Sequence, residues 1–152
     1  MNYQNSSIFL SILSILDNKA DITIYDTRSY EEYHSNSLPD AINVPGAEIV
    51  YRFKDLTPSE DTMVIVNCGG RTRSIIGAQS LINAGVPNKV VSLKNGTQDW
   101  HLAGYKVIKG AERRQPEVTG KGFEAALKYA RRVAELCDVK IKPHCNSVKS
   151  LN

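Results

Sequence analysis

Short apolar segments alternate with amphipathic ones along most of the chain. Residues 21–25, 63–67 and 89–93 have the composition of β-strands. The run MVIVN at 63–67 is apolar almost throughout, as expected of a parallel strand that is buried on both faces. A shorter β-prone piece covers residues 41–44, and residues 105–108 are expected to form a last edge strand. Together these segments predict a sheet of about five strands.

Helix-like segments fill the intervals between these strands. They are expected at residues 29–34, 47–53, 72–84 and 97–102. The third of them carries clear end signals, because Gly85 follows its last residue and Pro87 lies just beyond. The alternation of strand and helix predicts an α/β fold, a three-layer sandwich whose central, mostly parallel sheet is flanked by helices.

Two further segments lie outside this alternation. An amphipathic helix is expected to start near Ser6 or Ser7, with one apolar face formed by Phe9, Ile12, Leu13 and Leu16. The apolar run in this segment is too short to span a bilayer, and no basic residue precedes it, so neither a membrane span nor a secretion signal is predicted.

The composition changes after Gly110. A polar stretch that contains Pro116 predicts a linker, and residues 119–136 predict a final helix. Its apolar face is expected to consist of Phe123, Leu127, Ala130 and Ala134. The prediction is therefore one domain over residues 1–110, then a linker, C-terminal helix and tail over 111–152 that could lead into a further domain.

Composition and charge exclude some classes of function. The chain has 152 residues, of which 41% are hydrophobic and 23% charged, and its formal net charge is +3. These values are ordinary for a globular domain, and the charge is far below what nucleic-acid binding requires. We therefore predict no nucleic-acid partner and no membrane partner.

The three cysteines do not form a disulfide framework. Cys68, Cys137 and Cys145 are odd in number, which favours a reducing compartment and a cytoplasmic location. Cys137, His144 and Cys145 lack the four-ligand spacing of a zinc site. No metal and no organic cofactor is expected.

Cys68 follows the buried strand at 63–67 and precedes the predicted helix at 72–84. A loop that leads into a helix directs backbone N–H groups and the positive end of the helix dipole at one point, where an anion is favoured. Glycine is useful there, where φ becomes positive or where the backbone must approach a ligand, and Gly69 and Gly70 fit that need. Arg71 and Arg73 add positive charge.

A cysteine after a buried strand is often only a small core residue. Here the thiol, two glycines and two arginines fall within six residues at a strand-to-helix junction. A thiolate is the form that this environment stabilises. The combination therefore favours a reactive cysteine over a structural one.

The ordered motifs resemble those of the rhodanese (sulfurtransferase) family, over roughly residues 7–109. The matching segments are Asp26-Thr27-Arg28, Glu31-Glu32-Tyr33, Leu38 to Pro45, the loop Cys68 to Arg73, and Asn95-Gly96 with Trp100 and Gly104. The run CGGRTRSIIGAQSL is especially similar to domains of tandem multi-rhodanese proteins. The chain departs from the family pattern at Asn36, Ser37, Asp40 and Arg71.

The resemblance implies a six-residue sulfurtransferase loop. Related phosphatases and arsenate reductases use a Cys-x5-Arg loop, whereas Arg73 stands five positions after Cys68 and Ser74 occupies the sixth. The shorter loop suits a sulfane sulfur carried on Cys68. The family activity is then transfer of sulfur from thiosulfate or a related donor to a thiophilic acceptor through a Cys68 persulfide.

The resemblance also implies roles for individual residues. Cys68 is the expected nucleophile, and the expected anion-binding loop consists of Gly69, Gly70, Arg71, Thr72, Arg73 and Ser74. Asp26 and Arg28 are expected to support the loop or to form a structural salt bridge, and Trp100 to lie in the core or a pocket wall. The implied partners are a small anionic sulfur donor, a thiol or sulfur-carrier acceptor, and other rhodanese domains of a longer chain.

Two alternatives remain beside sulfur transfer. The domain could be a persulfide carrier or redox sensor that acts on a partner protein without turnover, as the departures at Asn36, Ser37 and Asp40 suggest. It could also be a phosphatase or arsenate reductase, against which the length of the loop argues.

Overall fold

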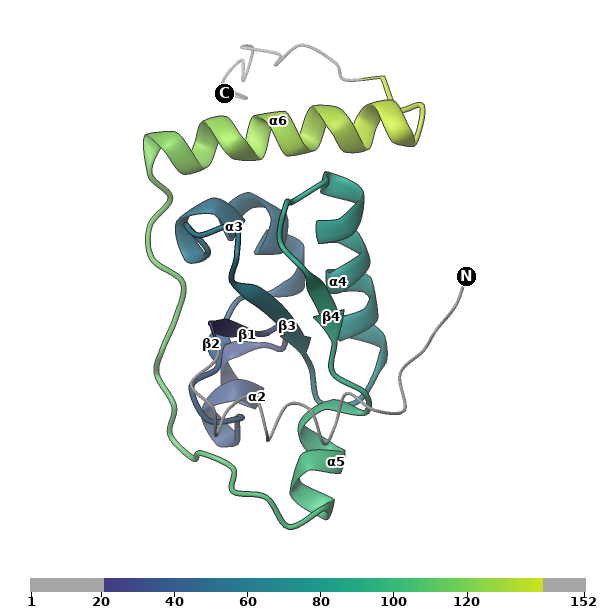
Figure 1. The fold of residues 1–152 in the computed structure, drawn as a ribbon. Coiled ribbons are helices and arrows are strands. Elements are labelled where there is room, and N and C mark those ends of the chain that lie inside the picture. The colour runs from purple at the N-terminus through teal and green to yellow at the C-terminus, as the bar shows by residue number, and fades with distance from the viewer. Residues whose placement is uncertain (1–20, 141–152) are drawn as a thin grey trace, which may run out of the picture.

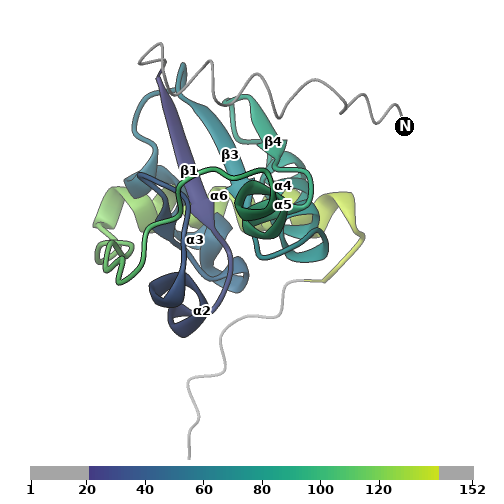
Figure 2. The same ribbon diagram turned by 90° about the horizontal axis from the view of Figure 1, so that it is seen from below.

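The computed structural model describes residues 21–140 of the chain. The expected N-terminal helix therefore lies outside the described residues. A parallel sheet forms the centre, with the strands in the order β2 (Ile42–Asn43), β1 (Ile22–Asp26), β3 (Met63–Asn67) and β4 (Val90–Ser92). Figure 1 shows the four strands at the middle of the molecule, and Figure 2 shows β1, β3 and β4 side by side from below.

Helices cover both faces of this sheet. On one face, Tyr25 and Val66 pack with residues of α3 (Ile49–Leu56) and α4 (Thr72–Ala84). On the other, Ile24 and Ile65 pack with residues of α2 (Tyr30–Ser35) and α5 (Gly96–Leu102). Side chains alternate between the two faces because successive residues of a strand point in opposite directions. The predicted three-layer α/β fold is confirmed.

Local signals explain several element boundaries. The predicted bounds of α4 are confirmed, and Gly85 ends the helix with a left-handed φ of 74° and an N–H that donates to the carbonyls of Leu81 and Ile82. Ser29 caps α2 through a capping box with Glu32. A 3-10 turn, η1 (Gly46–Glu48), leads into α3, where a single helix over 47–53 was expected.

The expected fifth strand, at residues 105–108, does not form. Within residues 21–140 the sheet has four strands, and residues 105–108 contribute only one antiparallel bridge, between Ile108 and Ser37. Ser37 does not belong to a strand, so this pairing cannot extend into a ladder. Further on, the N–H of Asn43 in β2 donates to the carbonyl of Arg113 at 2.9 Å. The expected linker thus runs beside the edge strand.

The final helix, α6 (Gly120–Leu136), packs against α3 and α4, across which it lies in Figure 1. Its buried residues are Gly122 and Ala126, and the ring of Tyr129 meets that of Phe53 edge-on at 6.3 Å. The predicted apolar face was wrong, because Phe123 and Leu127 are 49% and 44% exposed. The small residues Gly122 and Ala126 allow α6 to approach α3 and α4 closely, so the helix packs through the side that carries them.

Candidate functional site: the cysteine loop at the end of the sheet

The loop after β3 lies at the carboxyl edge of the parallel sheet. The chain continues from β1 to β2 in one direction and from β3 to β4 in the other, so the strand order reverses between β1 and β3. In open α/β sheets ligands bind at such a reversal, beyond the carboxyl ends of the strands. Asp26 ends β1 and Cys68 follows β3, so both predicted residues stand at this position.

Cys68 is a free cysteine and is only 2% exposed. Its Sγ lies 3.4 Å from Oγ of Ser74, which is fully buried in the first turn of α4. The Ser74 hydroxyl donates to the carbonyl of Arg71 at 3.0 Å and accepts a hydrogen bond from Ser92 Oγ at 3.1 Å. Ser92, the last residue of β4, was missed in the sequence because an isolated serine at a strand end carries no motif.

The carbonyl groups of the loop point toward α5. Thr97 N–H donates to the Cys68 carbonyl at 2.9 Å, and Gln98 N–H donates to the Gly69 carbonyl at 3.0 Å. Within the described chain, the N–H groups of residues 69–74 have no hydrogen-bond partner. These donors at the start of α4 can bind an anion, as expected for a loop that leads into a helix.

Gly96 allows this contact between α5 and the loop. Its φ is 58°, and a Cβ at this position would lie 2.0 Å from the Cys68 carbonyl oxygen. By contrast, neither Gly69 nor Gly70 has a positive φ. A Cβ on Gly70 would meet nothing within 4 Å, so the protein itself leaves that space open. The sequence suggested two reasons for these glycines, a positive φ or the close approach of a ligand. The backbone excludes the first, so close approach of a ligand remains.

Asp26 and Arg28 form a buried pair beneath the loop. The guanidinium binds both carboxylate oxygens, through Nε at 2.9 Å and Nη2 at 2.7 Å. Asp26 Oδ2 also accepts a hydrogen bond from Nδ2 of Asn67, the residue before Cys68, at 3.1 Å. Arg28 reaches onward to Asn36 Oδ1 at 3.1 Å. The pair therefore links the end of β1 to the residue from which the loop begins.

Arg73 binds a carboxylate of the protein itself. Its Nη1 and Nη2 lie 2.6 and 2.7 Å from the two oxygens of Glu32 in α2. This hydrogen bonding lowers the pKa of Glu32 to about 2 and raises that of Arg73. Arg71 is exposed, and its side chain makes no interaction within the described chain. Of the two loop arginines, Arg71 is thus the one without a bound carboxylate.

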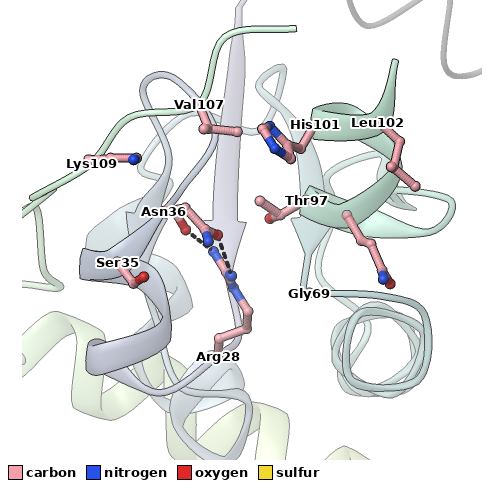
Figure 3. A pocket seen from close by; sticks show the side chains of 10 residues that line it. Arg28, Ser35, Asn36, Gly69, Thr97, His101, Leu102, Val107 and Lys109 are labelled. Carbon is pink, nitrogen blue, oxygen red and sulfur yellow. Dashed lines mark hydrogen bonds between the residues drawn. The ribbon is translucent and has the colours of Figure 1, made fainter. Parts of the chain in front are cut away.

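A pocket of about 730 Å³ adjoins the loop on its α5 side. Gly69 and Arg28 line it, together with Thr97 and His101 of α5 and Lys109 beyond it, as Figure 3 shows. None of the residues that line it is acidic. It borders the loop at Gly69 without including Cys68, so it lies beside the cysteine.

The remaining predicted residues are placed as follows. Trp100 is 2% exposed in the core, and its Nε1 donates to the carbonyl of Lys106 at 2.9 Å. Thr72 is the first residue of α4. Cys137 is exposed, whereas Cys145 lies outside the described residues. Among residues 21–140, no three His, Cys, Asp or Glu side chains gather as metal ligands would.

Comparison with known protein families identifies the fold. The rhodanese-like domain matches residues 11–103, which is more than half of the chain. The chain belongs to the rhodanese family. The matched residues of this rhodanese domain include the loop that follows β3 and contains Cys68.

Solved structures agree with this assignment. The crystal structure of thiosulfate sulfurtransferase from Pseudomonas aeruginosa is 48% identical, with a TM-score of 0.79 over 82% of this chain. A rhodanese-related protein from Thermoplasma volcanium is 27% identical, with a TM-score of 0.54 over 63% of this chain and 92% of that one. This chain spans only 24% of the Pseudomonas protein.

One relative is a transcriptional regulator and not a sulfurtransferase by name. The HTH-type transcriptional regulator Rv0324 of Mycobacterium tuberculosis is 33% identical over 91 residues, which are 60% of this chain and 39% of the regulator. The rhodanese domain thus resembles part of a sulfurtransferase and part of a regulator. No helix among the described residues is long and apolar enough to cross a membrane.

Proposed function

We propose that this rhodanese domain is a sulfurtransferase that carries sulfane sulfur on Cys68. The observation that carries the proposal is the position of Cys68 in a loop whose N–H groups, at residues 69–74, lack partners in the described chain. The 48% identity to a thiosulfate sulfurtransferase supports it.

The reaction would proceed in two displacements. The Cys68 thiolate attacks the outer sulfur of thiosulfate, a new S–S bond forms, and sulfite leaves with the electrons of the broken bond. The anionic persulfide is stabilised by the free N–H groups of the loop. A thiolate acceptor, from a small thiol or a sulfur-carrier protein, then attacks the terminal sulfur, and the Cys68 thiolate is released.

Charge at the loop favours an anionic donor. Arg71 is the loop arginine that has no carboxylate partner among the described residues, so it is the first candidate to meet the sulfonate end of thiosulfate. Arg73 can take the predicted role of an oxyanion ligand only if it shares its guanidinium with, or releases, Glu32.

The test is the intact mass of the protein after incubation with thiosulfate. We expect the mass of one added sulfur atom, mapped to Cys68, and its loss on addition of cyanide with formation of thiocyanate. Cys68→Ser should neither gain sulfur nor turn over. Cys137→Ser, which changes an exposed cysteine outside the loop, is the matched control. Sulfur transfer that survives in Cys68→Ser would refute the proposal.

The similarity to a transcriptional regulator favours a second candidate, a persulfide carrier or sensor that acts on a partner. Such a domain would gain sulfur on Cys68 stoichiometrically but show negligible thiocyanate production. Hydrolysis of an aryl phosphate, lost in Cys68→Ser, would instead support the phosphatase alternative.

A further inference from the structure

The Ser74 hydroxyl lies within hydrogen-bond distance of the Cys68 sulfur, at 3.4 Å, and its proton can change its hydrogen-bond partner. A hydroxyl has one proton and two lone pairs. With Cys68 as a thiol, all three are engaged, since Ser74 donates to the Arg71 carbonyl and accepts from Cys68 Sγ and Ser92 Oγ. Ser74 is fully buried, so water does not supply these partners.

Loss of the thiol proton changes what Ser74 must do. A thiolate only accepts hydrogen bonds, so Ser74 stabilises it by turning its proton from the Arg71 carbonyl toward Sγ, 3.4 Å away. Ser92 remains a donor to Ser74 Oγ throughout this change, at 3.1 Å. A hydroxyl that accepts one hydrogen bond becomes a stronger donor in the next, because the two bonds polarise each other.

The sheet fixes Ser92 in this position. Ser92 is paired with Val66 across β3 and β4, and the N–H of Leu93 donates to the Val66 carbonyl at 2.8 Å. Cys68 follows Val66 by only two residues. The pairing of β3 with β4 therefore positions both Cys68 and Ser92, the serine that donates a hydrogen bond to Ser74.

We propose that Ser92 is a positioning residue that favours the Cys68 thiolate through Ser74. The inference rests on the proposed function only in taking Cys68 as the reacting group. Ser92 does not touch Sγ in this arrangement, and its effect passes through one hydroxyl.

Charged groups also act on Cys68 and must stay constant in any test. Arg73 on α4 interacts electrostatically with it, and Glu32 on α2 pairs with that arginine. The Asp26–Arg28 pair lies at the end of β1, and Arg71 is in the loop itself. Substitution of a serine by alanine or threonine changes none of these charges.

The experiment measures alkylation of Cys68 by iodoacetamide as a function of pH, in a Cys137→Ser/Cys145→Ser background so that a single thiol reacts. We expect Ser92→Ala to move the midpoint of the profile up by about 0.5 pH unit and to slow alkylation about threefold below the midpoint. Ser92→Thr, which keeps the hydroxyl, should restore the original midpoint. Ser80→Ala is the matched control, because Ser80 Oγ bonds to the Ile76 carbonyl on the exposed side of α4.

A double variant tests whether the effect passes through Ser74. Ser74→Ala should raise the midpoint by itself, and adding Ser92→Ala should then change nothing further. An unchanged midpoint in Ser92→Ala overturns the proposal. So does failure of Ser92→Thr to restore the profile, or a shift of equal size in the Ser74→Ala background.

Alkylation requires no sulfur transfer, so the two proposals fail separately. If thiosulfate adds no sulfur to Cys68 but Ser92→Ala shifts the alkylation profile, the proposed function is wrong and the role of Ser92 stands. If sulfur is added and the profile does not move, the reverse holds.

Discussion

At the scale of single residues, the loop depends on a glycine outside it. Gly96 brings α5 against the carbonyls of Cys68 and Gly69, which leaves the loop N–H groups free for an anion. By contrast, a Cβ on Gly69 or Gly70 within the loop would not clash with the protein, and neither residue has a positive φ. The shape of the loop thus depends on a residue more than twenty positions away in the sequence.

Gly96→Ala should therefore impair the site strongly. The added Cβ would fall 2.0 Å from the Cys68 carbonyl oxygen, and φ is 58°. We expect a loss of about 1–3 kcal/mol in the free energy of unfolding and a fall of at least about tenfold in persulfide formation. Gly104→Ala is a matched control, since Gly104 also has a positive φ, of 81°, but open space around its Cβ. Equal effects of the two substitutions on persulfide formation would show that contact with the loop does not matter.

The Glu32–Arg73 pair should make stability depend on acid pH. The pKa of Glu32 in the folded protein, about 2, lies below the ordinary glutamate value of 4.5, so the pair stabilises the fold above pH 4.5 and loses its effect as the pH falls toward 2. The side chains are 43% and 48% exposed, which limits the contribution to less than about 1 kcal/mol. Glu32→Gln should therefore lower the urea midpoint at neutral pH.

The difference from the unmodified protein should shrink as urea titrations are repeated at increasingly acid pH. Gln retains an acceptor for the Ser29 N–H in the capping box, so the cap is kept. Glu112→Gln, at an exposed glutamate that forms no salt bridge among the described residues, is the control. A difference that is constant with pH would mean that the ion pair is not its source.

At the scale of elements, α6 docks through its smallest side chains. A Cβ on Gly122 would lie 1.9 Å from Asp55 Oδ2. The same carboxylate accepts hydrogen bonds from the N–H and the hydroxyl of Thr119, at 3.0 and 2.6 Å. The N-terminus of the helix is thus held to α3 by one aspartate and a glycine that leaves room for it.

Gly122→Ala should lower the stability of the protein, whereas Gly120→Ala should not. Alanine is the better helix former by about 1 kcal/mol, and Gly120 has open space around its Cβ, so Gly120→Ala should be neutral or stabilising. At Gly122 the added Cβ would displace the Asp55 carboxylate from its two hydrogen bonds to Thr119, and this loss should outweigh that gain and cost about 1–3 kcal/mol. Urea titration of both variants is the measurement, and stabilisation by both would show that α6 does not pack here as described.

At the scale of the whole molecule, the chain after residue 110 packs onto the predicted domain. The domain boundary at residue 110 remains a prediction, but α6 lies on α3 and α4, and the segment before it bonds to β2 through Asn43. The chain also spans only about a quarter of the Pseudomonas sulfurtransferase that it resembles. A role for further rhodanese domains therefore stays a proposal.

The sequence alone predicted the α/β fold, α4 with its end at Gly85, and the cysteine at a strand-to-helix junction. These features have local signals, because an apolar run, a left-handed glycine or a loop motif is complete within a few residues. The expected fifth strand failed because a strand also needs a partner, and Ile108 meets only Ser37.

Only the tertiary structure decided which groups surround Cys68. The Ser92–Ser74 hydrogen bond, the approach of Gly96 and the capture of Arg73 by Glu32 each join segments that are far apart in the sequence. A contact between distant segments also determines which face of α6 packs on the domain, because only a residue without a Cβ fits beside Asp55 at position 122. Such contacts depend on where the sheet places its strands and helices, whereas the cysteine that we propose as the nucleophile was indicated by a motif of six consecutive residues.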